Sequence, residues 1–178
     1  MKSTLHFSTI LLYLSIFLTS TSFDTFKASK EVICSELTDK YVDKLTGVER
    51  HIAKEKIIIR DYNGKNTFDL VWFKTHDEYT LAFKAAKNLC LDNNIDVSFH
   101  LLQGKVVTCA SAHIANCESL MTINFHESSV EESKFELISN SEVVGISFEN
   151  KEKNYKLKLG RRQANQFLKT LKCLRDQK

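Results

Sequence analysis

The stretch Lys56–Lys74, KIIIRDYNGKNTFDLVWFK, decides the fold class of this 178-residue chain. Its two flanks, Lys56–Tyr62 and Thr67–Lys74, are rich in β-branched and aromatic residues, which favour strands over helices. Asn63-Gly64 lies between them and is a strong short-range hairpin signal, because both residues accept a positive φ. The stretch therefore predicts two antiparallel strands joined by a tight turn.

Further along the chain, apolar residues alternate with polar ones in short runs, which is the pattern of half-buried strands. The Gln103-Gly104 pair predicts a second tight turn, and His100 alternates with two apolar residues, so we expect its side chain to face solvent. The runs comprise Tyr79, Leu81 and Phe83; Val97, Phe99 and Leu101; Met121, Ile123 and Phe125; Val144, Ile146 and Phe148; and Tyr155, Leu157 and Leu159.

Two segments have helical features. A short helix is expected from about Val130 to Ile138, and the end of the chain has apolar residues at helical spacing on one stripe. That stripe consists of Ala164, Phe167, Leu168, Leu171 and Leu174. The pattern predicts an α+β fold dominated by β structure, with antiparallel sheets of about seven to nine strands, one short helix and a C-terminal amphipathic helix.

The first 22 residues are typical of a signal peptide. Lys2 supplies a positive start, an apolar stretch follows from Phe7 to Ser20, and small residues place the expected cut near Ser22. An uncleaved signal anchor is the alternative, although the leader is short and rich in hydroxyl residues for a membrane span, which needs about 20 apolar residues. No later stretch approaches that length. We expect residues 23–178 to form a single globular exported domain, periplasmic or secreted.

Positive charge gathers at the C-terminal end of the chain. Residues 151–178 hold ten Lys or Arg and two acids, whereas the whole chain has a net charge of +3. Such a face attracts anionic surfaces or partners, although a solvated strand followed by a solvated helix explains the same pattern. The expected basic face consists of Lys151, Lys153, Lys156, Lys158, Arg161 and Arg162.

A short motif and the order of the C-terminal elements resemble a known group of proteins. Asp43-Lys44-Leu45-Thr46-Gly47 resembles the opening of small exported proteins and lipoproteins of Bacteroidetes bacteria, and the ending of helix, strand, charged hairpin and helix is similar to theirs. The resemblance implies an extracytoplasmic protein and supplies no catalytic residue. The first cysteine, Cys34, lies too far from the leader to carry a lipid anchor.

The five cysteines leave several pairings open, and their odd number leaves at least one thiol without an intramolecular partner. In an oxidising compartment, nearby cysteines more often pair than bind metal. We consider a Cys109–Cys117 disulfide and a Cys34–Cys173 disulfide, with Cys90 as the expected leftover. A weaker hypothesis is a zinc site in which His126 completes the C-x3-H-x3-C pattern of Cys109, His113 and Cys117.

No phosphate-binding loop, dinucleotide fingerprint, nucleophile elbow or zinc-protease motif is present in the sequence. We therefore expect no catalytic residue, no cofactor and no specific nucleic-acid motif. The leading hypothesis is a non-catalytic exported binding module that contacts an anionic surface or a partner protein through the basic face. The alternatives are a secreted inhibitor or immunity-like protein, which would expose an apolar patch, and a hydrolytic enzyme without a recognisable motif.

Overall fold

The predicted hairpin is confirmed in the computed structural model, which describes residues 33–177 except 77, 113–114, 127–129 and 152. Strand β3 (Ile57–Arg60) pairs antiparallel with β4 (Thr67–Thr75). Gly64 takes a φ of +66° in the connection, and its N–H donates to the Asp61 carbonyl over 2.9 Å. The expected tight turn is not formed, because Asn63 does not take a positive φ and the strands are joined by a longer loop between Asp61 and Asn66. The expected signal peptide, residues 1–22, lies outside the described part of the chain.

The first sheet contains six strands, all paired antiparallel. Its order is β1-β2-β4-β5-β8, and β3 pairs with the first half of β4, along the same edge of β4 that β2 uses further on. Besides β3 and β4, the strands are β1 (Thr38–Val42), β2 (Glu49–Ala53), β5 (Glu78–Ala85) and β8 (Leu120–His126).

The second sheet has the order β10-β9-β6-β7 and is also antiparallel. Its strands are β6 (Asp96–Leu101), β7 (Val106–Ala110), β9 (Val143–Asn150) and β10 (Lys153–Lys158). The two sheets meet at both sides: the Tyr62 N–H donates to the Lys156 carbonyl over 2.9 Å, and the Ala112 N–H donates to the Thr122 carbonyl over 2.8 Å.

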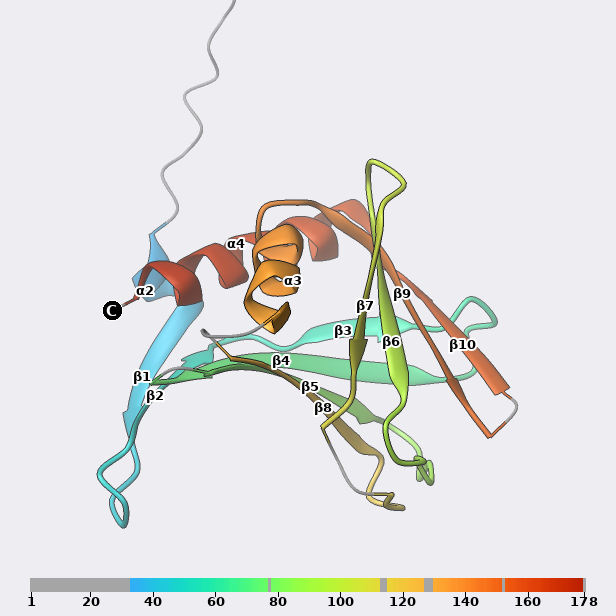
Figure 1. The fold of residues 1–178 in the computed structure, drawn as a ribbon, viewed down its shortest axis with the longest axis horizontal. Helices are drawn as coiled ribbons and strands as arrows, with labels where there is room; N and C mark the ends of the chain where they lie inside the picture. Colours follow the sequence, from blue (N-terminus) through green and yellow to red (C-terminus); the bar gives the residue numbers. More distant parts are fainter. Residues whose placement is uncertain (1–32, 77, 113–114, 127–129, 152, 178) are drawn as a thin grey trace, which may run out of the picture. The chain divides into compact units, whose positions relative to one another are not determined.

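Helices cover the inner face of the first sheet (Figure 1). The short helix α2 (Cys34–Leu37) contacts the long C-terminal helix α4 (Arg161–Asp176), while α3 (Val130–Ser139) packs on β7 and β8. Trp72, which is 1% exposed, is the centre of an aromatic cluster that joins the sheet to both longer helices. Its ring lies 5.4–6.1 Å from the rings of Phe125, Phe135 and Phe167.

The predicted fold class is confirmed, and four of the five alternating runs bury the expected side chains. The exception is β9, where the pairing register shifts between His100 and Leu101. This irregularity buries Val143 and leaves the expected Val144 half-buried. In the described part of the chain the structure has ten strands and three helices.

Candidate functional site

The outer face of the second sheet carries two polar rows that cross its strands. Because successive side chains point to opposite faces of a strand, Lys156 and Lys158 lie on the face opposite the buried Tyr155 and Leu157. The register places Lys158 beside Gly145 and Gly145 beside His100. The next row consists of Lys156, Ser147, Ser98 and Thr108.

A hollow of about 280 Å³ lies where these rows meet β9. Its floor includes Gly145, where a Cβ atom would come within 3.2 Å of the Leu157 carbonyl oxygen. The register shift in β9 lies directly beside this glycine, and such irregularities often redirect side chains near functional sites. We call it the β9–β10 hollow; its side-chain lining includes Tyr62, His100, Ser147, Lys156 and Lys158.

The groups around the β9–β10 hollow differ in how well they are paired. The His100 Nε2 atom lies 2.8 Å from Ser147 Oγ, and the Ser98 and Thr108 hydroxyl oxygens are 2.9 Å apart. Both lysines are exposed. Within the described residues, neither ammonium group has a hydrogen bond or an ion pair. The hollow therefore combines two unneutralised positive charges with hydroxyl and imidazole groups that donate and accept hydrogen bonds.

The structure divides the basic face expected from the sequence. Lys153 lies on the other face of β10, with its Nζ atom 4.7 Å from the Tyr155 ring centroid. Lys151 lies in the turn before it. Arg161 and Arg162 begin α4 and border a different depression, which also contains Glu55. Of the six basic residues, the β9–β10 hollow is thus lined by Lys156 and Lys158 alone.

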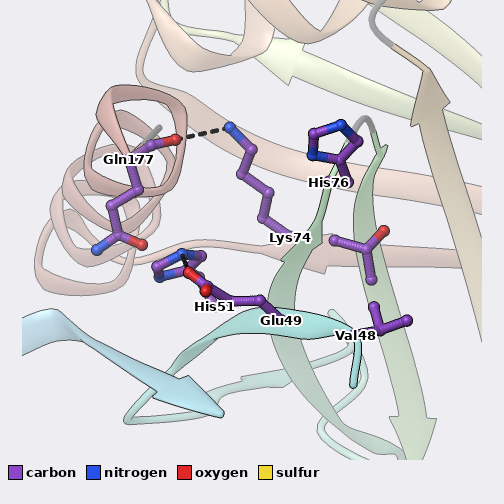
Figure 2. Close-up of a pocket in the computed structure, with 7 residues that line it drawn as sticks. Val48, Glu49, His51, Lys74, His76 and Gln177 are labelled. Carbon is purple, nitrogen blue, oxygen red and sulfur yellow. Dashed lines mark hydrogen bonds and ion pairs between the residues drawn. The ribbon is translucent and has the colours of Figure 1, made fainter. Parts of the chain in front are cut away.

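A second cavity, of about 400 Å³, lies between β2, β4 and the end of the chain. We call it the C-terminal pocket (Figure 2). Lys74, only 8% exposed, points toward the last turn of α4 and donates to the Gln177 carbonyl over 2.8 Å. Its Nζ atom also lies 4.9 Å from the centroid of the Tyr79 ring. The pocket is lined by Val48, Glu49, His51, Lys74, Thr75, His76 and Gln177.

Three ionisable side chains of the C-terminal pocket are bound to other groups of the protein, since Lys74 donates to a backbone carbonyl and Glu49 contacts both His51 and Lys40. His51 Nε2 lies 3.1 Å from a Glu49 carboxylate oxygen, and the other oxygen of Glu49 forms a 2.6 Å ion pair with Lys40. The hydrogen bond from Lys40 is the main reason that the pKa of Glu49 lies below its ordinary value. The Thr75 hydroxyl donates to the Glu78 carbonyl over 3.5 Å. This arrangement resembles a structural network more than an activated nucleophile.

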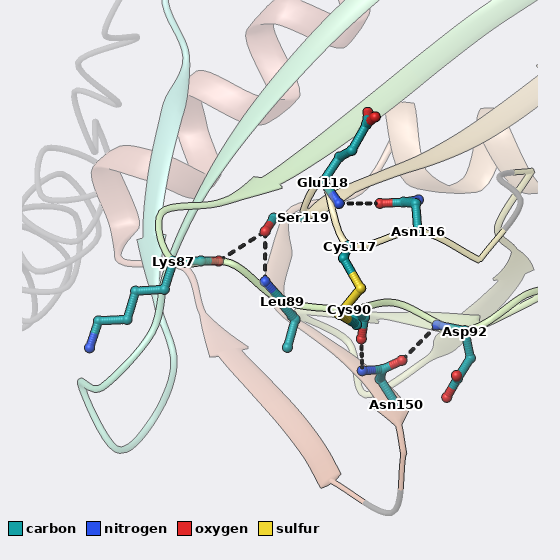
Figure 3. The surroundings of a disulfide bond; sticks show 9 residues. All are labelled: Lys87, Leu89, Cys90, Asp92, Asn116, Cys117, Glu118, Ser119 and Asn150. Atoms are coloured by element: carbon teal, nitrogen blue, oxygen red, sulfur yellow. Dashed lines mark hydrogen bonds between the residues drawn. A yellow bond between two sulfur atoms is a disulfide. The ribbon is translucent and has the colours of Figure 1, made fainter.

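Two disulfides are present, and one differs from the expected pairing. Cys34 pairs with Cys173, as considered from the sequence, and this bond ties α2 to α4. Cys117 pairs with Cys90 and not with Cys109 (Figure 3). Cys109 is a free, buried residue of β7. The physical reason is alternation: β7 turns the Cys109 side chain into the core.

Figure 3 also shows how side chains hold the two loops that the Cys90–Cys117 bond joins. The Asn150 amide donates to the Cys90 carbonyl over 2.9 Å and accepts the Asp92 N–H over 2.8 Å. Ser119 bridges the first loop in the same way, donating to the Lys87 carbonyl and accepting the Leu89 N–H. Local sequence spacing carries no sign of these long-range contacts.

The structure does not assemble the hypothetical zinc site from the members that it describes. The Cys117 sulfur is bonded to Cys90, and burial raises the pKa of the Cys109 thiol to about 12, which disfavours the thiolate that binds metal. His126 lies at the end of β8, 4.0 Å from Glu78, and His113 is outside the described residues. In the described part of the chain, no group of three metal-ligating side chains is found.

Comparison with known proteins found no matching family model, no matching curated protein and no matching solved structure. Among the helices that the structure describes, none has the length and apolar character required to cross a membrane.

Proposed function

We propose that this protein is an exported, non-catalytic binding module that holds an anionic partner at the β9–β10 hollow. The observation that carries the proposal is the position of Lys156 and Lys158, which are exposed and lack a side-chain partner in the described residues. An unpaired charge attracts an anionic ligand, whereas a charge that is already in an ion pair within the protein attracts it less strongly.

Several features support an extracytoplasmic location for the module. The sequence begins with a segment typical of a signal peptide, and the two disulfides are compatible with an oxidising compartment. The resemblance of Asp43–Gly47 to exported proteins favours the same location. In the structure this motif is a turn: the Asp43 carboxylate accepts the N–H groups of Leu45 and Thr46 over 2.9 and 3.0 Å.

Retention on an anionic matrix tests the proposed binding. The mature protein should elute from heparin or phosphocellulose at a lower salt concentration after Lys156→Glu/Lys158→Glu, because a repulsive charge replaces each attractive one. Lys169→Glu/Lys172→Glu is the matched control, since it changes the net charge equally on the exposed side of α4. Equal losses in both variants would contradict a site at the hollow, because they would show either net-charge attraction or binding at the depression on α4 that Lys169 also lines. Unchanged retention in the first variant would refute the proposal.

Arg161→Glu/Arg162→Glu completes the comparison of basic surfaces. These two residues border the separate depression at the start of α4. If the β9–β10 hollow is the binding site, this variant should behave like the α4 control. A larger loss here than at Lys156 and Lys158 would move the anionic site to the helix and contradict our assignment.

A second candidate function, an inhibitor or other protein-docking module, rests on the tip of the β1–β2 hairpin. Leu45 is 97% exposed there, and Tyr41, Val42 and Val48 are 40–50% exposed. The Asp43 turn and the positive φ of Gly47 give this apolar tip a defined shape. Leu45→Asp should abolish capture of a protein partner if the tip is the contact surface, and should leave anionic-matrix retention unchanged.

A further inference from the structure

The β9–β10 hollow and the two polar rows beside it point to a particular class of ligand. We infer that this face binds an oligosaccharide in which one sugar carries a carboxylate or sulfate group. The inference rests on the proposed function, because it names the anionic partner of the same site. It goes further in that it assigns roles to neutral groups that do not attract charge.

The side chains of the Lys156 row suit a ligand that is charged at one end and neutral along the rest. Only the β10 positions are cationic; the positions on β9, β6 and β7 in the Lys156 row are hydroxyl residues, namely Ser147, Ser98 and Thr108. Hydroxyl groups and imidazole both donate and accept hydrogen bonds, which matches the hydroxyl groups of a sugar. The lysines would hold the acidic substituent at one end, and the hydroxyl row would contact the neutral sugars.

Tyr62 offers an aromatic ring to a sugar at the edge of the hollow, where its side chain is 70% exposed. Its backbone N–H donates to the Lys156 carbonyl, so its position relative to β10 is fixed. An exposed aromatic ring presents a flat apolar face with a polar end. Such a face suits the apolar side of a sugar ring, while the two lysines beside it reach the acidic group.

The size of the β9–β10 hollow and the length of the polar row also fit an oligosaccharide. A volume of about 280 Å³ lies just below the usual range for small-molecule pockets, so the hollow itself accommodates a single ring. The polar row continues beyond it across four strands, a distance of about 14 Å at the ordinary strand spacing. A ligand with one sugar in the hollow and further sugars along the row would use the whole face.

Nucleic acid and anionic membrane fit this face less well. Asp96 and Glu149 are exposed on the same face, one row beyond Ser98 and Ser147. Their negative charges would repel a continuous phosphate backbone or headgroup layer, whose binding depends on many cationic contacts. A ligand with a single acidic group avoids this repulsion.

A glycan array is the direct test, using the mature full-length protein and oligosaccharides of matched length in neutral, carboxylated and sulfated forms. We expect binding to carboxylated or sulfated members, at least about tenfold above their neutral parents. The two acidic series distinguish the two sources of negative charge. Equal binding to neutral parents, or binding to none, would overturn the inference, as would tighter binding of an oligo-dT strand or of phosphatidylglycerol vesicles.

Variants of Tyr62 separate this inference from the proposed function. Tyr62→Ala should weaken binding of the best array sugar by about tenfold, whereas Tyr62→Phe should retain most of it, because the ring face is kept. Neither change alters the charge, so retention on a sulfonated polystyrene cation exchanger, which carries negative charge but no sugar, should be unaffected. If Tyr62→Ala leaves sugar affinity unchanged, the sugar inference fails. If Lys156→Glu/Lys158→Glu leaves heparin retention unchanged, the proposed function itself fails.

Discussion

The C-terminal pocket and the β9–β10 hollow contain similar groups in opposite situations. Each has a lysine and a histidine close to a β-strand backbone. Lys74 is buried and donates to the Gln177 carbonyl, whereas Lys156 is exposed and has no side-chain partner in the described residues. Cavity size is therefore a poor guide here: in the larger cavity Lys74 and Glu49 are bound to other groups of the protein, whereas at the smaller one the ammonium groups of Lys156 and Lys158 have no partner in the described residues.

The physical reason is the cost of burying charge. A buried ammonium group is tolerated only when other groups replace its water shell, so Lys74 must remain bound to its partners. An exposed ammonium group keeps its hydration and needs no internal partner, so its charge remains available to a ligand. The two regions should therefore respond differently to the same changes: loss of a lysine should lower stability at the C-terminal pocket and lower binding at the β9–β10 hollow.

The Cys34–Cys173 bond should have the largest effect, because it closes a sequence separation of 139 residues beside the C-terminal pocket. In the chain-entropy model, Cys34→Ser/Cys173→Ser lowers the free energy of unfolding by about 5 kcal/mol. Cys90→Ser/Cys117→Ser is the control; its separation of 27 residues corresponds to about 3.5 kcal/mol. Guanidinium unfolding measures both, and a greater loss in the control would contradict the assigned order.

Lys74→Met should come next. The change keeps most of the side-chain volume but removes the donor to the Gln177 carbonyl, which lowers the free energy of unfolding by about 2 kcal/mol. Lys74→Met also removes one positive charge, so retention on an anionic matrix should fall only as much as in Lys169→Met, which removes one charge at a distant site. A stability change below about 0.5 kcal/mol would show that the pocket network is not structural.

Asp61→Asn tests the turn that positions Tyr62 and has a defined pH dependence. Burial favours the neutral acid, but hydrogen bonds from Asn66 and Lys65, with the nearby charge of Lys153, outweigh it and hold the pKa of Asp61 below its ordinary value of 3.8. The carboxylate therefore stabilises the fold fully above pH 3.8, and this contribution is lost as the pH falls through the lower folded-state pKa.

At neutral pH we expect Asp61→Asn to cost about 1 kcal/mol of unfolding free energy. The difference from the parent protein should narrow as the solution is acidified below pH 3.8, because the parent then loses the same interactions. Urea unfolding at neutral and acidic pH provides the measurement. A difference that stays constant or widens on acidification would show that the carboxylate charge is not what stabilises this turn.

Lys156→Met/Lys158→Met should have the smallest effect on stability and a large effect on binding. Neither lysine has a side-chain partner in the described residues, so the free energy of unfolding should change by less than about 0.5 kcal/mol. Heparin retention should nevertheless drop further than in Lys169→Met/Lys172→Met. A clearly lower free energy of unfolding in Lys156→Met/Lys158→Met would contradict the difference from Lys74, since it would mean that these two charges also stabilise the fold.

Local patterns were enough to predict the elements that carry the site. The β3–β4 hairpin, the alternation along β10 and the outward position of His100 each depend on residues that are close in sequence. The sequence did not predict that the six basic residues lie on different surfaces, since this depends on where β10 ends and α4 begins. The β1–β2 hairpin had no alternating signal, because β1 buries only Thr38 and leaves its other side chains exposed.

The sequence by itself determined the fold class, the strands of the two polar rows and the amphipathic C-terminal helix, because strand propensity, turn chemistry and helical spacing act over a few residues. Only the tertiary structure decided that His100, Gly145 and Lys158 lie side by side and that Cys117 pairs with Cys90. It also decided that Lys74 donates to the Gln177 carbonyl, whereas Lys156 has no side-chain partner among the residues that the structure describes. These facts depend on strand register and on contacts between distant segments, where the packing of the whole core selects one pairing among many that local preferences allow.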